Sequence, residues 1–337
     1  MRFLLATIVT LSLALPAAAD PVRLVDQALS RHVLPGFAML TERTSELASA
    51  AAADCKPDSI SLRKTYGAAF DAWLGVSHLR FGPTEVDSRG FALAFWPDPR
   101  SKTSKALRQL IQVEDPIILS AQDFATLSVA ARGFYAMERM LYDPAIQATG
   151  TDEYRCQLTV AIARDIALTS ALIEDDWNTN YAPLLIAAGP GNATYATPRE
   201  AVKELFKALT GGLQFTAELR LGRPLGTFDR PRPKRAEARL SERSLRNAVL
   251  SVKANGNLAK ILAEEHPNID VALAQAVELI EVQARDLDPI FAMVSTPSDR
   301  IKVEIFQQSI NEVRAIIGGE LGPALQVAQG FNALDGD

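Results

Sequence analysis

Glu138 and Tyr135 are the two side chains whose types and spacing most suggest chemistry. Apolar residues recur at helical spacing around them, which predicts one continuous helix over 121–142 with both side chains inside its apolar stripe. A buried carboxylate requires a partner, a proton or a metal ion, and helical residues three apart can contact one ligand. The pattern therefore predicts either a binding site or a structural pair, in which tyrosine and carboxylate satisfy each other or an arginine.

The N-terminus has the pattern of a secretory signal. Arg2 supplies a charged start, residues 3–15 form an apolar stretch, and alanines at 17–19 form a small-residue cleavage site before Asp20. The apolar stretch is too short to span a membrane permanently, and no cysteine follows the cleavage site to take a lipid anchor. We therefore predict a signal peptide over residues 1–19 and a soluble periplasmic protein that is not a lipoprotein.

The charge balance limits the class of partner. Without residues 1–19 the chain keeps 34 of its 35 basic residues and all 40 acidic residues, a formal charge of −6. This mild acidic excess disfavours nucleic acid as a partner and is compatible with binding a cation.

The two cysteines, Cys55 and Cys156, would meet an oxidising compartment after export. An even count in such a compartment predicts a disulfide between them. Two buried thiols or two metal ligands are the alternatives, although residues so far apart and without a CxxC pair are a weak metal signal.

The periodic segments have helical spacing nearly throughout, and no strict alternation runs long enough to build a sheet. We therefore predict an all-α protein with two similar four-helix bundles packed side by side and long inter-helix loops. The predicted domains are residues 20–150 and residues 151–337. The predicted helices are 22–53, 59–79, 102–111, 121–142, 152–188, 197–220, 241–256, 270–294 and 298–317.

Two long loops, 81–100 and 221–239, interrupt the helical pattern and are places where function is expected. The first contains carboxylates, guanidinium forks and an aromatic ring, at Asp87, Arg89, Trp96, Asp98 and Arg100. Arginine forks bind carboxylates or phosphates bidentately, so an anionic small molecule is a candidate ligand. The alternative is that Trp96 plugs the end of the bundle and the charges are solvated.

The second loop carries a basic run interleaved with prolines, at Arg230, Arg232, Lys234 and Arg235. Such a run is typical of a solvated loop and could also contact an acidic surface or phospholipid headgroups.

The segment GFYAME, with Gly133, Tyr135 and Glu138, resembles the GxHxxE motif of the imelysin-like proteins, formerly catalogued as M75 peptidases. The resemblance spans the mature chain. Further matching segments are Phe81-Gly82-Pro83, Phe95-Trp96-Pro97-Asp98, Arg155-Cys156, Pro224-Leu225-Gly226, Glu242, Ser244-Leu245 and residues 330–337.

The resemblance implies two helical bundles with a ligand site at their interface, and an exported protein of iron acquisition. It carries Gly133 and Glu138 over as motif residues, with Tyr135 at the place of the motif histidine. Together with the loop residues Trp96, Asp98 and Arg100 these are the predicted ligand-binding residues, and Tyr135, Glu138 and Asp98 are the predicted metal ligands. The partners implied are iron or an iron chelate and a membrane transport component. A C-terminal tail that docks near the interface is also implied.

Tyr135 stands where the motif has histidine. A tyrosine must lose a proton with a pKa of about 10 before it binds a metal strongly, so this variant favours Fe³⁺ over Zn²⁺ if a metal binds. None of His32, His78 and His266 belongs to an HExxH or HxxE pattern, and a catalytic zinc requires three protein ligands. The leading interpretation is a binding or accessory protein, with no catalytic residue assigned; the alternatives are an M75-type metallopeptidase and a scaffold protein that has lost the site.

Overall fold

The structure is a computed structural model that describes residues 20–327. The described residues form helices and connecting loops with no β-strand, apart from an isolated bridge between Thr227 and Arg230. The prediction of an all-α fold is confirmed. The predicted signal peptide, residues 1–19, and the predicted docking tail, residues 330–337, lie outside the described residues.

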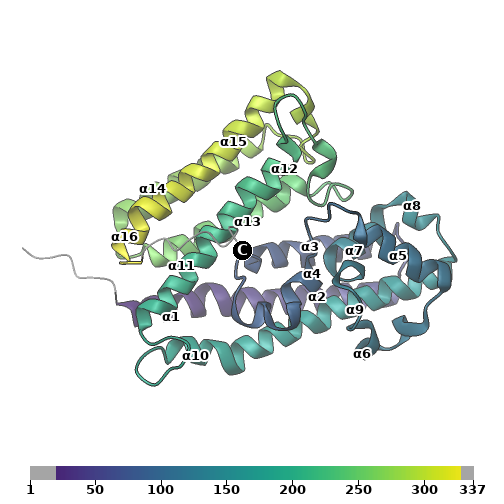
Figure 1. Ribbon diagram of the computed structural model, residues 1–337, viewed down its shortest axis with the longest axis horizontal. Helices are drawn as coiled ribbons and strands as arrows, with labels where there is room; N and C mark the ends of the chain where they lie inside the picture. Colours follow the sequence, from purple (N-terminus) through teal and green to yellow (C-terminus); the bar gives the residue numbers. More distant parts are fainter. Residues whose placement is uncertain (1–19, 328–337) are drawn as a thin grey trace, which may run out of the picture.

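One group of helices is built on the long antiparallel partners α2 and α9 (Figure 1). Helix α1 runs through a π-helical turn, Leu29–Val33, directly into α2, and α2 packs against both α3 and α9. Helix α7, which carries the GFYAME segment, packs against α9. The bounds are α1 Pro21–Ala28, α2 Leu34–Ala53, α3 Ile60–Val76, α7 Gly133–Tyr142 and α9 Asp152–Asp176.

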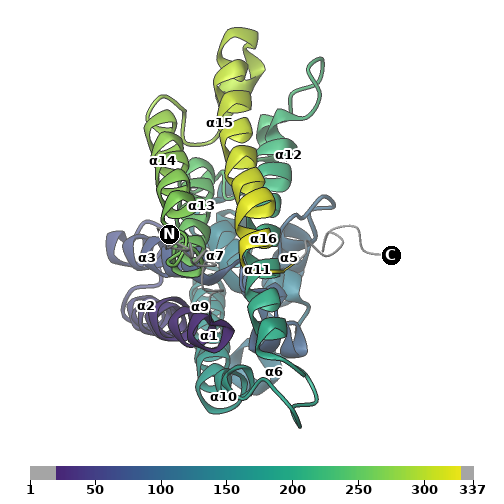
Figure 2. The ribbon, with the colours of Figure 1, turned by 90° about the vertical axis from the view of Figure 1, so that its left-hand side faces the viewer.

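A second group contains the later helices, and Figure 2 shows it beside the first. Helix α13 packs against α11 and α14, and α14 packs against α15. The bounds are α11 Pro198–Gln214, α13 Ser244–Leu262, α14 Pro267–Ala284 and α15 Pro297–Ile316. The two groups meet where α3 packs against α13 and where α1 packs against α11, so one continuous cluster of buried apolar side chains runs through both.

The packing divides the chain differently from the sequence-based boundary after Gly150. That boundary assigns α9 to the second domain, whereas α9 packs against α2 and α7 of the first group. Helix α1 is joined to the first group but packs against α11 and α13 of the second. The reason is burial: most of the inward face of α9 is apolar and is covered by the earlier helices.

Short helices fill the connections, including the two loops predicted from sequence. They are α4 Arg89–Leu93, α5 Lys102–Val113, α6 Ala121–Phe124, α8 Pro144–Gln147, α10 Ala182–Ile186, α12 Gly222–Leu225 and α16 Gly322–Ala324. The remaining turns are 3-10 helices at Gly82–Thr84, Val86–Ser88, Pro116–Leu119, Val129–Ala131, Pro233–Arg235 and Ala292–Ser295, and π-helices at Trp177–Tyr181, Phe215–Leu221 and Ile317–Leu321.

The prediction of one continuous helix over 121–142 is wrong. The chain forms α6, then the 3-10 turn Val129–Ala131, and only then α7, which begins at Gly133. Gly133 has a φ of +73°, and a Cβ atom there would collide with the carbonyl groups of Ala92 and Leu93. Glycine permits both the left-handed conformation and the close approach. The break therefore depends on contacts with the last residues of α4, about forty residues earlier in the chain.

A disulfide joins Cys55 to Cys156, with their Cα atoms 5.1 Å apart. It ties the chain just after α2 to the first turns of α9. The helix that runs from Asp152 to Ile186 is long and apolar enough to cross a membrane by length and composition alone, but 56% of its most apolar window is buried inside the protein. Its contacts with α2 and α7 are those of a core helix.

Candidate functional site

Tyr135 and Glu138 lie on the buried face of α7 that is turned toward residues 236–241, the segment that leads into α13. The Tyr135 hydroxyl donates to Oε1 of Glu237 at 2.5 Å. Glu138 Oε1 accepts from the backbone N–H of Ser241 at 3.0 Å and from its hydroxyl at 2.7 Å. The two motif side chains therefore do not satisfy each other; each has a partner in the 236–241 segment.

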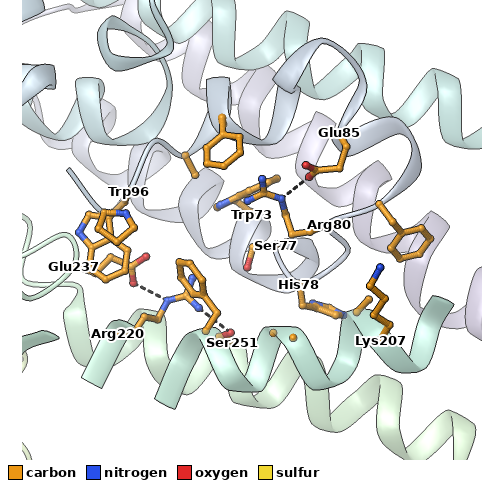
Figure 3. Close-up of a pocket in the computed structure, with 18 of the residues that line it drawn as sticks. Trp73, Ser77, His78, Arg80, Glu85, Trp96, Lys207, Arg220, Glu237 and Ser251 are labelled. Carbon is orange, nitrogen blue, oxygen red and sulfur yellow. Dashed lines mark hydrogen bonds and ion pairs between the residues drawn. The ribbon is translucent and has the colours of Figure 1, made fainter. Parts of the chain in front are cut away.

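Glu237 also forms a buried ion pair. Its Oε2 lies 2.8 Å from Nε of Arg220, and the two residues are 1% and 5% exposed. Arg220 Nη1 donates further to the hydroxyls of Thr216 and Ser251, each at 3.1 Å. Figure 3 shows the contact with Ser251. A buried ion pair is tolerated only when its remaining donors and acceptors are also hydrogen-bonded. Thr216 and Ser251 accept from Arg220, and Tyr135 donates to Glu237.

Burial sets the protonation of the two motif residues. Loss of solvent raises the pKa of the Tyr135 phenol well above its usual value, and the negative charge of Glu237 adds to this. Burial also raises the pKa of the Glu138 carboxyl, against the two hydrogen bonds from Ser241, which lower it. Both environments favour the neutral forms of these groups.

A cleft of about 450 Å³ lies between the two helix groups, which we call the interface cleft. Its walls combine aromatic side chains, among them Trp73, Phe91, Trp96 and Phe215, with polar and charged ones, among them His78 and Arg220. Figure 3 shows the Arg220–Glu237 pair at one end and His78 with Lys207 at the other. A hollow with aromatic walls and fixed polar groups is the usual form of a small-molecule site.

A second cleft, of about 250 Å³, lies on the other side of Tyr135. We call it the basic cleft because its wall includes Arg223, Lys234, Arg235 and Arg239. Asp98 and Glu138 also line it. Trp96 and Tyr135 border both clefts, so the two hollows adjoin at these residues.

The structure brings four of the predicted ligand residues, Trp96, Asp98, Tyr135 and Glu138, to the basic cleft. Trp96 is half-buried and packs edge-on against Phe215 of the second helix group, at 5.9 Å between ring centroids. Asp98 caps α5, because its carboxylate accepts from the backbone N–H groups of Lys102 and Thr103 at 2.8 and 2.9 Å.

Three other residues singled out from the sequence, Gly133, Arg100 and Arg89, lie outside both clefts. Gly133 is buried against the α4 segment and lines neither cleft. Arg100 is exposed and also lines neither. Arg89 forms an ion pair with Asp176 at 2.9 Å, which fixes the 81–100 loop to the end of α9.

Sequence reasoning missed Arg220, Glu237 and Ser241. Arg220 belongs to the apolar stripe that continues from α11 into the π-helix Phe215–Leu221, and a buried arginine demands an acidic partner. The alternation of charged residues and alanines in the RAEAR segment, which contains Glu237, also indicated that a charged residue could be buried there. Neither pattern indicates that Arg220, just before the 221–239 loop, pairs with Glu237 near the end of that loop.

Most oxygen atoms of the three predicted metal ligands are already hydrogen-bonded within the protein. Tyr135 is bonded to Glu237, Glu138 to Ser241, and Asp98 to backbone N–H groups. Among residues 20–327, no group of three or more histidine, cysteine, aspartate or glutamate side chains is placed to hold a metal ion. The arrangement thus fits a bare ion poorly, since Tyr135 would have to ionise and Arg220 to leave its partner.

Two histidines meet at the far end of the interface cleft. Nε2 of His32, in the turn between α1 and α2, lies 3.0 Å from Nε2 of His78, which follows α3. Burial lowers the pKa of His32 to about 4 and holds the pKa of His78 well below its usual value. The pair is therefore neutral at pH 7, with one N–H donating to the other ring.

The structure resembles solved proteins along nearly its full length. One is an imelysin-like protein from Psychrobacter arcticum 273-4, with a TM-score of 0.78, 16% identity, and coverage of 92% of this chain and 97% of that one. Another, from Parabacteroides distasonis ATCC 8503, is named as an iron-regulated protein A precursor, with a TM-score of 0.76, 12% identity, and coverage of 93% and 97%. At these identities the likeness shows a shared fold.

No curated protein sequence matches the chain significantly. The family model described as Imelysin, Peptidase M75, matches residues 33–317, which is most of the chain and includes α7, the 236–241 segment and both clefts. The chain therefore belongs to the imelysin (peptidase M75) family.

Proposed function

We propose that this protein is an exported binding or accessory component of iron uptake, with its ligand held between the two helix groups. The observation that supports this best is that the interface cleft and the basic cleft adjoin at Trp96 and Tyr135, so that α7 borders both. The name of one structural relative, an iron-regulated protein A precursor, agrees with an iron-related role. Export is proposed from the signal pattern of residues 1–19.

The proposed ligand is ferric iron carried by an organic chelator. The Tyr135 phenol, the Asp98 carboxylate and one oxygen of Glu138 are occupied by hydrogen bonds, whereas the clefts offer aromatic walls and cationic side chains. Those groups suit a chelate, which brings its own oxygen ligands to the iron. A membrane transport component is a further proposed partner, because a binding protein in iron uptake must deliver its cargo.

A peptidase function has less support from the geometry. A catalytic zinc centre needs three protein ligands and an activated water, and residues 20–327 bring no three suitable side chains together. The third reading, a scaffold without a small ligand, has one observation in its favour: Tyr135 and Glu138 already have protein partners.

Isothermal titration of the mature chain with ferric citrate, with ferric nitrilotriacetate and with Zn²⁺ tests the proposal. We expect saturable binding of at least one ferric chelate and weaker binding of Zn²⁺. Trp96→Ala should weaken the ferric complex at least about tenfold, because it removes the wall that both clefts share.

Glu312→Ala, at an exposed position on α15, is the matched control and should bind as the wild type does. Circular dichroism of both variants checks that they fold. Absence of ferric binding by the wild type, or identical affinity in Trp96→Ala, would reject the proposal. In that case chelator-sensitive cleavage of an unfolded protein would support the peptidase reading, and its absence the scaffold reading.

A further inference from the structure

The wall of the basic cleft carries cationic side chains that no carboxylate neutralises. Arg223 comes from α12, Lys234 and Arg235 from the 3-10 turn Pro233–Arg235, and Arg239 from the 236–241 segment. None of the four takes part in an ion pair with another residue of 20–327. Arg223 and Arg239 are half-buried, whereas Lys234 and Arg235 are exposed at the rim of the cleft. Most of the protein's other buried or half-buried arginines have an acidic partner, as Arg132, Arg220 and Arg243 do.

Arg223 is the most informative of these side chains. Its Nε atom is buried and has no hydrogen-bond acceptor among the described residues. Its guanidinium lies over the ring of Trp96, at 5.6 Å from the centroid, and burial together with the nearby charge of Arg235 lowers its pKa. A buried donor without an acceptor and two adjacent like charges are both unfavourable, and an anion in the cleft would relieve both.

The acidic side chains that line the cleft do not supply a counter-charge to Arg223 and Arg235. Asp98 is engaged with the backbone N–H groups at the start of α5. Glu138 is engaged with Ser241, and burial raises its pKa toward the neutral form. The cleft therefore concentrates positive potential in a hollow with low-dielectric walls, which attracts anions.

The loop that carries these residues is held in place from behind. The backbone N–H of Arg232 donates to the carbonyl of Pro224 at 2.8 Å. Arg300 of α15, which is 6% exposed, donates to the carbonyl of Leu225 at 2.6 Å. The backbone that carries Arg223 and Arg235 is thus fixed by the fold, so binding between them does not require the loop itself to be ordered.

We infer that the basic cleft binds a small multivalent oxyanion, with the forks of Arg223 and Arg235 as bidentate donors and Trp96 as an aromatic wall. The cleft of about 250 Å³ suits a compact anion rather than a large ligand. Carboxylate and phosphate groups both match a guanidinium fork. The inference rests on the proposed function in that it names the chemical class of the ligand at the same interface.

The test uses iron-free anions on the mature chain. Citrate, pyrophosphate and inorganic phosphate are titrated at low salt and again at 0.2 M salt. We expect saturable binding of citrate or pyrophosphate that weakens as salt rises, with the preferred anion identifying the ligand as a carboxylate or a phosphate. Arg223→Gln and Arg235→Gln should each weaken that binding about tenfold or more, the usual loss for a charge-assisted hydrogen bond.

Arg230→Gln is the matched control, since it removes the same charge from an exposed residue of the same loop that does not line the cleft. It should change the affinity less than twofold. Arg223→Lys keeps the charge and loses the fork, and should fall between wild type and Arg223→Gln. No saturable binding of any of the three anions, or equal losses in Arg223→Gln and Arg230→Gln, would overturn the inference.

The two proposals fail in different ways. Binding of iron-free anions that depends on Arg223, without binding of any ferric chelate, would support the anion site and reject the iron function. Ferric binding that is unchanged in Arg223→Gln and Arg235→Gln would support the iron function and reject the anion site.

Discussion

The hydroxyl oxygen of Tyr135 lies 2.5 Å from Oε1 of Glu237, across the boundary between the two helix groups. The other oxygen of the same carboxylate holds Arg220 at 2.8 Å. The motif tyrosine is therefore the outer member of a buried network that includes an arginine from the second group. A ligand that binds the Tyr135 hydroxyl must therefore displace its hydrogen bond to Glu237.

Replacing Glu237 by alanine should destabilise the protein by about 3–5 kcal/mol, because Arg220 would remain buried without a counter-charge. Urea unfolding followed by circular dichroism measures the change. The double variant Glu237→Leu with Arg220→Met should recover most of the loss, since it removes both charges. Asp299→Asn, which breaks the exposed pair with Lys302, is the control and should cost less than about 0.5 kcal/mol. A loss below about 1 kcal/mol in Glu237→Ala would contradict the structure.

The phenol of Tyr135 should stay protonated in the folded protein at pH 11, because burial holds its pKa well above the usual value. The absorbance change of tyrosine ionisation between pH 9 and 11 should thus be the same in wild type and Tyr135→Phe while both remain folded. Unfolded tyrosines release protons near pH 10, so the unfolded state binds fewer protons than the folded state above that pH. Stability must therefore fall as pH rises above about 10. A smaller absorbance change in Tyr135→Phe would show that Tyr135 ionises normally.

The His32–His78 pair should make the protein acid-sensitive. The pKa of His32 is lowered to about 4 in the folded state, against about 6.5 when unfolded. As pH falls below 6.5, His32 takes up a proton in the unfolded chain but not in the folded one. The free energy of unfolding therefore decreases until the pH reaches about 4. His32 alone should account for roughly 3 kcal/mol of that loss.

Unfolding free energies of wild type and His32→Leu, each measured at pH 7 and at pH 5, give the comparison. The difference between the two pH values should be smaller in His32→Leu, since carboxylates contribute equally to both proteins. Equal pH dependence in the two proteins would rule out the proposed role of the pair.

Gly133→Ala should destabilise the protein by more than about 2 kcal/mol, because it adds a Cβ to a residue with positive φ and drives it against the carbonyls of Ala92 and Leu93. Gly319→Ala provides the control: this helical glycine has nothing within 4 Å of the added Cβ, so the change should be neutral or stabilising by up to about 1 kcal/mol. Thermal melts of the two variants suffice for the comparison. Similar melting temperatures would argue against the close contact at Gly133.

The sequence predicted the burial of Glu138 correctly but for an incomplete reason. Its apolar neighbours in α7 do form a buried stripe, whereas Phe124 and Leu127 belong to separate turns before Gly133. Helical periodicity cannot register that break, because Gly133 adopts its positive φ in response to carbonyl groups of residues 92 and 93. A lone glycine in a helical pattern costs only about 1 kcal/mol, so it does not by itself indicate an end.

The partners of the motif were beyond the reach of sequence patterns. Glu237 and Ser241 lie about a hundred residues after Tyr135 and Glu138, in a loop whose prolines and basic residues are typical of a solvated segment. That description fits Lys234 and Arg235, which are exposed, and fails for Glu237, which is 1% exposed. Adjacent residues of one loop thus have opposite environments, and only the packing of α7 against it decides which is which.

The close approach at Gly133 also has a topological meaning. The chain leaves this point at Leu93, passes through α5 and α6, and returns to the same point at Gly133. Residues 94–132 are thus an excursion with touching ends, and changes of length within it need not displace the helix that follows. A loop of this excursion, which contributes Trp96 and Asp98 to the clefts, can therefore change in length while α5 keeps its packing against α7, the helix that carries Tyr135 and Glu138.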